Sequence, residues 1–342
     1  TLKQHNLVDL ITSSKILGKI NLFSSMHSVN NKRFKNEKAT QIFDRYATYN
    51  GSNPYSAPAT LNVIPHLEHN IGGFFPLNGM HALTQSLVKL GEELGVNYHF
   101  NAEVDEIVVK NNIAIGVKVN QKEIGYDQVI SGSDVVHTYR KLLKNHKAPE
   151  RILNQEKSAS AIVFYWGIKK EFRNLTLHNV LFSKNYKAEF DAIFGKNYPF
   201  KDPTVYINIT SKHQIKDAPK GCENWFVMIN APHQKGQKWD SIIKQSRKNI
   251  IDKINKTLKT DIEPLIEVED ILEPRLIASR TRSYLGALYG NASNSKWAPF
   301  LRHSNFSKKI KHLYFCGGSV HPGGGIPICM LSAKIVDELM HS

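Results

Sequence analysis

A glycine-rich loop late in the sequence is the segment best suited to hold a ligand. The apolar run Leu313–Cys316 predicts a buried strand, and five of the nine residues from 317 to 325 are glycine. The next residues predict a helix, Ile326–Met340, with Pro327 in its first turn, where a missing N–H does no harm. The free N–H groups and the dipole of such a helix start attract anions, and glycines let a bulky ligand approach the backbone. The pattern therefore favours an anion site over an ordinary tight turn.

Other polar side chains offer chemistry with less support. His321 lies in the same loop and has a pKa suited to proton transfer, but we expect it to hydrogen-bond the backbone. Asp134 is expected to cap a helix that begins at Val135 rather than to act as a base. His66 and His69 have a spacing that suits a metal, but no third ligand lies nearby, so no metal is expected. No residue is assigned a catalytic role.

The elements expected to position the loop begin with a compact α/β unit. The leucines of Met80–Gly95 predict an amphipathic helix that stops at a glycine. Three strands are expected after it, at Tyr98–Val109, Ala114–Val119 and Gln128–Ile130. No G-x-G-x-x-G and no phosphate-binding lysine loop occurs. The phosphate-cradling half of a nucleotide site is therefore missing or precedes Thr1.

The middle of the chain is predicted to be mainly β-structure. Short runs of β-branched and aromatic residues predict strands at Ala161–Trp166, Thr204–Ile209 and Trp225–Asn230. A helix is expected at 238–258, and a further extended segment with one turn at Leu276–Leu288. Aromatic residues of this region are candidates to line an apolar site, although core packing is the simpler role for most of them.

The charge of the chain is strongly positive. Its 45 lysines and arginines exceed its 30 acids, giving a formal net charge of +15. Basic stretches lie at 1–50, 235–259 and 296–311; the first is predicted to be helical, with an apolar stripe from Leu7 to Ile20. Such a surface suits nucleic acid, an anionic membrane or an acidic ligand. Segment 51–80, rich in proline and glycine, is expected to be an ordered but irregular connection.

Length and composition narrow the class of protein. The chain has 342 residues, 41% hydrophobic and 22% charged, which fits about two globular domains and excludes disordered, coiled-coil and collagen-like chains. Its three cysteines form neither a disulfide framework nor a zinc pattern, as is typical of a reducing compartment. Its longest apolar run is about half the roughly 20 residues of a membrane-spanning helix.

The glycine loop carries a family resemblance. Its Gly-Gly-Ser-Val-His-Pro-Gly-Gly-Gly-Ile-Pro resembles the C-terminal flavin motif of bacterial carotenoid desaturases of the phytoene desaturase type. Further similar stretches are 45–58, 73–80 and 102–107, the second with Asn78 where the family has glycine. Residues 131–139 resemble the family's Ser-Asn-Ala-Asp segment, with Gly132 in place of the asparagine.

The resemblance implies an α/β flavoprotein fold. It is the Rossmann-like FAD/NAD(P)-binding fold without its N-terminal βαβ unit, together with a β-sheet substrate domain and a helical membrane-facing region. The implied division is 1–78 helical and irregular, 79–150 part of the FAD-binding domain, 151–295 substrate domain, and 296–342 the rest of the FAD-binding domain. The chain is expected to be the C-terminal two thirds or so of such an enzyme, and to bind FAD weakly or not at all by itself.

The resemblance also implies which residues hold FAD. Gly317, Gly318 and Ser319 would line its ribityl chain and pyrophosphate. Gly325, Ile326 and Pro327 would bring the helix start to the pyrimidine edge of the flavin, where negative charge gathers on reduction.

Two more residues are implied at the adenine end of FAD. Val104 would contact the adenine, although a plain role in the strand core is equally expected, and Ser131 would lie close by. The implied function is desaturation of a carotenoid by hydride transfer to FAD. The expected partners are a carotenoid and an anionic membrane, not nucleic acid, and the expected location is cytoplasmic, at the inner face of the cell membrane.

Several alternatives stay open. A hydroxycarotenoid 3,4-desaturase, a carotene isomerase or a retinol saturase would share the motif. An amine oxidase of the same fold would turn over amines instead of polyenes. A non-catalytic basic protein that binds membrane or nucleic acid would explain the charge but would leave the glycine loop unused.

Overall fold

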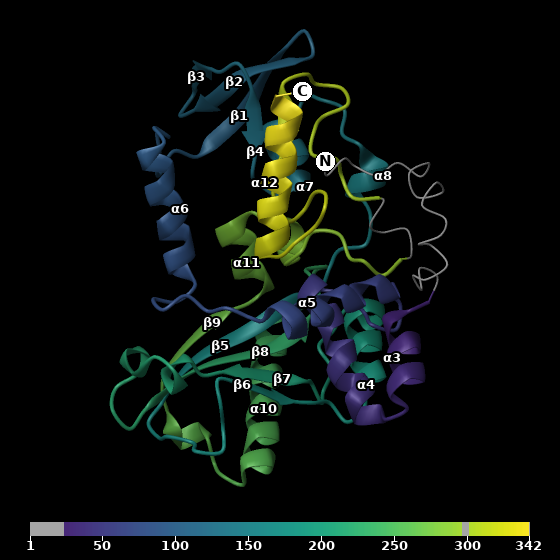
Figure 1. Ribbon diagram of the computed structural model, residues 1–342, viewed down its shortest axis with the longest axis vertical. Coiled ribbons are helices and arrows are strands. Elements are labelled where there is room, and N and C mark those ends of the chain that lie inside the picture. Colours follow the sequence, from purple (N-terminus) through teal and green to yellow (C-terminus); the bar gives the residue numbers. More distant parts are fainter. Residues whose placement is uncertain (1–23, 296–300, 342) are drawn as a thin grey trace.

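The computed structural model describes residues 24–295 and 301–341, which form two halves with a group of helices at one side (Figure 1). A five-stranded sheet is the framework of one half. The other half holds two small sheets and the long helix α12 (Ile326–Met340). The predicted helical segment 1–50 is described only from residue 24, and its apolar stripe lies outside the described residues.

The five-stranded sheet is antiparallel, with strand order β6-β7-β8-β5-β9. Three of its strands confirm predicted strands and two were not predicted from the sequence. The five are β5 (Ser160–Ile168), β6 (His178–Leu181), β7 (Val205–Asn208), β8 (Glu223–Ala231) and β9 (Ile266–Leu272).

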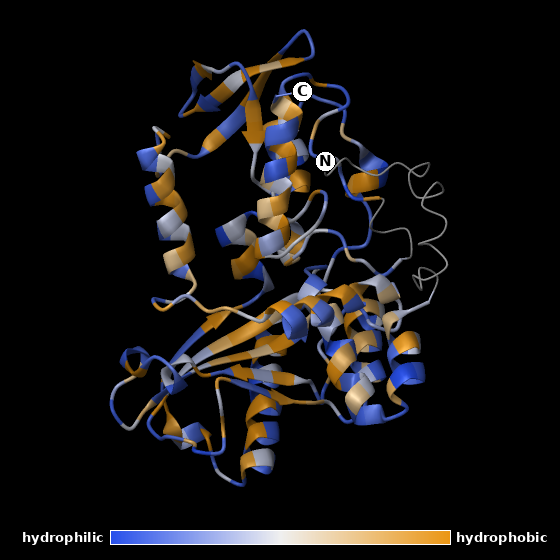
Figure 2. Cartoon of the chain, viewed as in Figure 1, coloured by the Kyte–Doolittle hydropathy of each residue, from blue (hydrophilic) through white to orange (hydrophobic). Residues whose placement is uncertain are grey.

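The core of this half lies between the sheet and helix α10 (Trp239–Leu258). Every second residue of β8 is buried, because alternate side chains of a strand point to opposite faces. Trp225 and Val227 thus pack in one cluster with Ile250 and Ile254 of α10. Figure 2 shows many hydrophobic residues along these strands, and both hydrophobic and hydrophilic residues on α10.

The other half is assembled from two distant stretches of the chain. A three-stranded antiparallel sheet lies beside a two-stranded parallel pair in which β4 and β10 join. Its elements are α6 (His81–Glu93), β1 (Val104–Lys110), β2 (Ile113–Val119), β3 (Lys122–Gly125), β4 (Val129–Ser131), α7 (Val135–His137), α8 (Glu150–Leu153), β10 (Leu313–Phe315) and α12. Asn111 and Asn112 turn between β1 and β2, as predicted, and both have positive φ.

The remaining helices are short. They are α3 (Met26–Phe34), α4 (Glu37–Asp44), α5 (Val63–Ile71), α9 (Tyr186–Phe190) and α11 (Pro274–Thr281). Short 3-10 helices span Arg45–Asn50, Ala59–Asn62, Thr210–Lys212, Ile215–Asp217, Glu263–Leu265 and Tyr284–Gly286, and π-helical turns span Thr138–Leu142 and Asp191–Lys196.

Three local predictions were wrong. Segment 276–288 is not extended but contains α11, because Pro274 suits a first helical turn and the Glu273 side chain caps it by accepting a hydrogen bond from the Arg275 N–H. Segment 51–80 is not irregular throughout, since α5 forms there and ends at Gly72 with φ of 99°. The strand expected from residue 98 begins only at 104.

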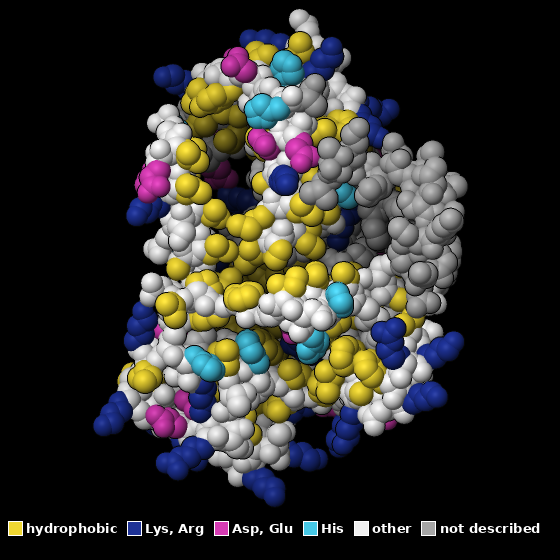
Figure 3. All heavy atoms as spheres, in the orientation of Figure 1, with side chains coloured by type: hydrophobic (Ala, Val, Ile, Leu, Met, Phe, Trp, Pro, Cys, Tyr) yellow, Lys and Arg dark blue, Asp and Glu magenta, His cyan; other side chains and the backbone are white. Residues whose placement is uncertain are grey.

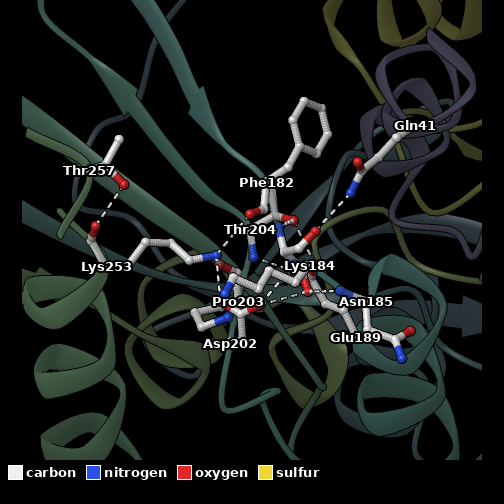
Figure 4. Close-up of polar contacts among 11 residues, drawn as sticks. Gln41, Phe182, Lys184, Asn185, Glu189, Asp202, Pro203, Thr204, Lys253 and Thr257 are labelled. Atoms are coloured by element: carbon white, nitrogen blue, oxygen red, sulfur yellow. Dashed lines mark hydrogen bonds and ion pairs between the residues drawn. The ribbon is translucent and has the colours of Figure 1, made fainter. Parts of the chain in front are cut away.

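A buried polar cluster fixes α4 and α9 to the sheet (Figure 4). The Gln41 side chain donates a hydrogen bond to the Ser183 carbonyl at 3.0 Å. Glu189 is fully buried, and its two carboxyl oxygens accept hydrogen bonds from the N–H and the hydroxyl of Thr204. Lys253 of α10 donates to the carbonyls of the neighbouring loops, so three separate segments meet at this point.

Candidate functional site

The strand, glycine loop and helix form as predicted. β10 is buried at Leu313 and Phe315 and runs parallel to β4, with Phe315 opposite Ser131. The Cys316 N–H extends the pairing by donating to the Ser131 carbonyl at 3.0 Å. Helix α12 begins at Ile326, the expected residue. The loop therefore leaves the end of one buried strand and enters a helix start beside the end of another.

Two of the loop glycines are needed for different reasons. Gly325 has φ of 111°, which side chains rarely adopt, and a Cβ there would meet open space. Gly324 is limited by packing, since a Cβ would lie 2.6 Å from the Tyr289 ring. The backbone thus lies tightly on the protein at Gly324 and is open next to the helix start at Gly325.

The start of α12 keeps its donors for a ligand. No side chain of the described residues caps this helix, and Pro327 lies in its first turn. The first backbone N–H groups of a helix have no partner within the helix, and the dipole makes this end electropositive. The arrangement suits an anion or the polar edge of an aromatic ring system.

Asn305 joins the two ends of the loop. Its side-chain amide donates to the carbonyls of Phe315 and His321 and approaches the Ser332 hydroxyl at 2.9 Å. The Ser332 oxygen also accepts from the Gly317 N–H at 3.1 Å. Asn305 and Ser332 are both buried. Sequence reasoning did not identify either residue, because single polar residues far apart in the chain give no local pattern.

Ser319 and Asp134 share the start of α7. The Ser319 oxygen accepts a hydrogen bond from the Val135 N–H at 2.9 Å. One Asp134 oxygen accepts from the Val136 N–H at 2.8 Å, which confirms Asp134 as a cap. In this arrangement the hydroxyl proton of Ser319 is left to donate elsewhere. The His321 backbone N–H donates to the His303 carbonyl.

The two residues expected at the adenine lie on different sheets. Ser131 is buried at the end of β4, next to the loop, and its hydroxyl shares a hydrogen bond with that of Thr138 at 2.7 Å. Val104 begins β1 of the three-stranded sheet and pairs with Val119. The structure thus brings Ser131 to the loop, whereas Val104 belongs to the neighbouring sheet.

Two buried cations lie under the loop. The Arg302 guanidinium donates to the carbonyls of Tyr289, Asn291 and Gly318 and to the Asn50 side chain, at 3.0 to 3.5 Å. Lys157 donates to the Leu153 carbonyl and to the Asn291 side chain. Burial lowers the pKa of Arg302 to about 10 and that of Lys157 to about 8. Neither residue was identified from the sequence.

Two cysteines and two histidines remain as candidates for nucleophilic or metal-binding roles. Burial raises the pKa of both Cys316 and Cys329, so their thiols stay protonated near neutral pH and are poor nucleophiles. His66 and His69 lie on α5, away from the loop in the sequence; Asn70 contacts the His66 ring and Phe43 contacts the His69 ring.

The sequence profile of the flavin containing amine oxidoreductases matches residues 17–336. The chain belongs to this family. Membership implies a flavin cofactor, and the described loop and helix start fit a flavin ligand because they combine open backbone donors with an electropositive end.

Several curated relatives act on carotenoids by name. The chain is 54% identical over 310 residues to a 1-hydroxycarotenoid 3,4-desaturase of Flavobacterium sp. (strain P99-3), an alignment covering 91% of this chain and 64% of that protein. It is 31% identical to a 4,4'-diaponeurosporene oxygenase of Staphylococcus haemolyticus, over 94% of this chain and 65% of the relative. A phytoene desaturase of Fusarium fujikuroi is 29% identical, over 90% of this chain and 58% of the relative. The chain thus spans less than two thirds of the length of these relatives, and the predicted resemblance to carotenoid desaturases is confirmed.

Solved structures confirm the flavoprotein fold. An oxidoreductase from Methanosarcina mazei matches 100% of this chain and 73% of its own, with a TM-score of 0.66 at 13% identity. A triple mutant of putrescine oxidase matches 99% of this chain and 70% of its own, with a TM-score of 0.55 at 12% identity. Within residues 24–295 and 301–341, no helix has the length and apolar character needed to cross a membrane.

Proposed function

We propose that the chain is part of an FAD-dependent carotenoid desaturase. The observation that carries the proposal is the strand, glycine loop and uncapped helix start at 313–327, in a chain 54% identical to a carotenoid 3,4-desaturase. FAD, when bound, supplies the hydride acceptor for removing two hydrogens from adjacent carbons of a polyene. The residues of this chain hold the cofactor, align the polyene and exclude water.

The loop residues divide the proposed cofactor contacts between them. Gly317, Gly318 and Ser319 bind the ribityl chain and the pyrophosphate, where the Ser319 hydroxyl retains a proton to donate. Gly325, Ile326 and Pro327 place the helix start at the pyrimidine edge of the flavin, and its dipole stabilises the negative charge that gathers there on reduction.

Val104 and Ser131 are proposed for the adenine end of FAD. The place of Ser131 beside Phe315 at the end of β4 supports this role, whereas for Val104 only the resemblance does. The order of the sheets along the chain supports the proposed division at 78, 150 and 295. Strands β1 to β4 precede the five-stranded sheet in sequence, and β10 follows it.

An exposed apolar surface supports a substrate of polyene character. Leu67 and Ile71 on α5 are exposed, and Phe74 and Leu77 in the next loop are 85% and 87% exposed. Met330, one turn into α12, is 47% exposed. Figure 3 shows hydrophobic side chains gathered across the middle of this face, between the two halves. Large exposed apolar patches mark binding sites for apolar ligands or membranes.

The proposed location is the cytoplasmic face of an anionic membrane, in which the carotenoid dissolves. Lys32, Arg33, Lys35 and Lys38 are exposed on and between α3 and α4, and each basic residue near such a surface contributes about 1 kcal/mol of attraction. Of the candidate substrates, a 1-hydroxylated carotenoid is the first to test, because the 54% identical relative is named for it.

The test is conversion of a carotenoid in liposomes. The protein is supplied with FAD, and a 1-hydroxylated carotenoid and phytoene are offered in separate reactions. Each new conjugated double bond shifts the absorption to longer wavelength, and mass spectrometry shows the loss of two hydrogens per bond. Oxidation of amines with no change in either polyene would overturn the proposal in favour of an amine oxidase.

A further inference from the structure

The buried cations under the glycine loop form no ion pair with a carboxylate of the described residues, although Asp134 attracts Lys157 from a distance. Arg302 and Lys157 are 6% and 5% exposed, and no carboxylate of the described residues bonds to either. Two buried acids elsewhere in the chain do have ion-pair partners: Glu223 pairs with Lys212 and Glu273 with Arg275, each within 2.9 Å.

A buried cation without an anion is costly. Removing a charge from water costs several kcal/mol even after the protein relaxes, and hydrogen bonds to neutral carbonyls recover only part of this. Sites that retain such charges are frequently functional sites. The two cations are also linked to each other, because Arg302 donates to the carbonyl and Lys157 to the side chain of Asn291.

Both cations connect to the loop where an anionic ligand is proposed. Arg302 donates to the Gly318 carbonyl, and its guanidinium lies 3.3 Å from the position that a Cβ on Gly323 would take. Gly290, next to Asn291 in the chain, packs against Ser319 so closely that a Cβ would lie 2.8 Å from the Ser319 Cα. The segment that joins the two cations therefore lies directly against the loop.

We propose that Arg302 and Lys157 are positioning residues that supply a buried positive field beneath the glycine loop, and that this field strengthens the binding of a pyrophosphate-type anion at Gly317–Ser319. The proposal rests on the proposed FAD site. It gives the two cations a close anionic partner, which no ion pair of the described residues supplies; Asp134 acts on Lys157 only from a distance.

The mechanism is indirect. The two terminal nitrogens of Arg302 already donate to backbone and side-chain oxygens, so we expect the guanidinium to act through the loop. A carbonyl that accepts from a cation polarises its peptide group, which makes the next N–H, here that of Ser319, a stronger donor. The buried charge, which no ion pair of the described residues neutralises, also attracts the anion through the low-dielectric interior.

The experiment is a thermal-unfolding titration of the purified chain with inorganic pyrophosphate, FAD and riboflavin. Sodium chloride at matched ionic strength is the reference. Pyrophosphate and FAD should raise the unfolding midpoint beyond the salt effect, and riboflavin, which has no phosphate, should not reproduce the pyrophosphate response.

The variants separate charge from structure. Arg302→Gln and Lys157→Gln should each weaken pyrophosphate binding by about tenfold, whatever their own stability. Arg302→Lys, which keeps the charge but loses the fork of donors, should recover part of the response. Lys334→Gln, an exposed charge removed from α12, should respond like the wild type.

Two results would overturn the inference. One is a wild-type chain that responds to pyrophosphate no more than to salt. The other is an unchanged response in Lys157→Gln and in whichever Arg302 variant folds, which would leave the two cations with a structural role. If the carotenoid assay fails but the pyrophosphate response still depends on the two charges, only the proposed carotenoid substrate is overturned.

Discussion

Gly324 shows how closely the glycine loop is packed at the level of one residue. Replacement by alanine places a Cβ 2.6 Å from the Tyr289 ring. Tyr289 is held in place because its backbone N–H donates a hydrogen bond to the Ser158 hydroxyl. We expect Gly324→Ala to lower the free energy of unfolding by about 1 to 3 kcal/mol, the usual cost of overpacking. Urea unfolding followed by circular dichroism measures it.

The matched control for Gly324 is Gly132, at the end of β4. A Cβ on Gly132 meets nothing within 4 Å, and its φ is not in the left-handed region. Gly132→Ala should therefore change the stability by less than about 0.5 kcal/mol. Equal losses in the two variants would mean that the Tyr289 contact does not constrain the loop.

Glu189 should make the stability depend on pH. Burial raises the pKa of its carboxyl from 4.5 to about 7, although the hydrogen bonds from Thr204 act in the opposite direction. The folded state therefore binds the proton more tightly than the unfolded state, and stability falls as pH rises from about 4.5 to about 7. The loss attributable to Glu189 across this window is about 3 kcal/mol.

The variant Glu189→Gln isolates this effect. A glutamine amide can keep both contacts with Thr204 but does not titrate. Urea unfolding at pH 5, 6 and 7 should show the wild type losing stability relative to the variant at each step, with no further divergence above pH 8. A constant difference between the two proteins from pH 5 to 7 would contradict the raised pKa.

At the level of elements, the two halves differ in how their strands are held. β5 is paired along its length on both sides, to β8 and to β9, whereas within the described residues β10 has β4 as its one strand partner and on its other side only a short bridge to residues 305–307. Strand amides open more readily where fewer hydrogen bonds and apolar contacts hold them.

Hydrogen exchange should reveal this difference. We expect the amides of Val163 to Trp166 to exchange at least about tenfold more slowly than those of Leu313 to Phe315, a difference of about 1.4 kcal/mol in opening free energy. Mass spectrometry of peptic peptides can measure both segments in one sample. Equal protection would show that the glycine-loop half is as stable as the sheet.

Elements with local signals could be predicted from the sequence, and the others could not. Helix α12 was predicted to the residue because an apolar run, a glycine loop and Pro327 mark its start within a few positions. Strands β6 and β9 were missed because they are mostly half-buried or exposed and lack a clear alternation. The proline and cap signals of α11 were present but were outweighed by the apolar residues that follow.

The candidate site divides in the same way. Its glycines and Pro327 follow one another in the chain, so the loop could be predicted. Asn305, Arg302 and Lys157 could not, because their roles depend on partners that the fold brings from elsewhere in the chain. A lone buried lysine or arginine has no sequence pattern that distinguishes it from an exposed one.

At the scale of the whole molecule, membrane association is the property to test. We expect the protein to float with anionic liposomes, to float less as salt rises, and to float less after Lys3, Lys15 and Lys19 are changed to Glu, because screened charge attraction provides the binding. These lysines lie outside the described residues, so Lys32→Glu with Lys35→Glu provides an independent variant on α3 and its C-cap.

The controls for flotation are neutral liposomes and high salt. Equal flotation with neutral lipid at high salt would remove the electrostatic part of the prediction and leave the apolar surface as the cause. A protein that never floats would remove membrane association altogether.

The parallel pair of β4 and β10 has a consequence for the order in which the protein is made. The Val135 N–H and the Ser319 hydroxyl lie 184 positions apart in the sequence, with the whole five-stranded sheet between them. Joining the ends of a flexible loop of this length costs about 5 kcal/mol of entropy, so early folding of the sheet makes the later pairing easier. A ribosome adds roughly 5 to 20 residues per second, so several seconds separate the release of β9 from that of β10. During this interval the faces of β4 and α7 that β10 and the glycine loop later cover remain exposed, and we expect this half of the nascent chain to benefit most from a chaperone.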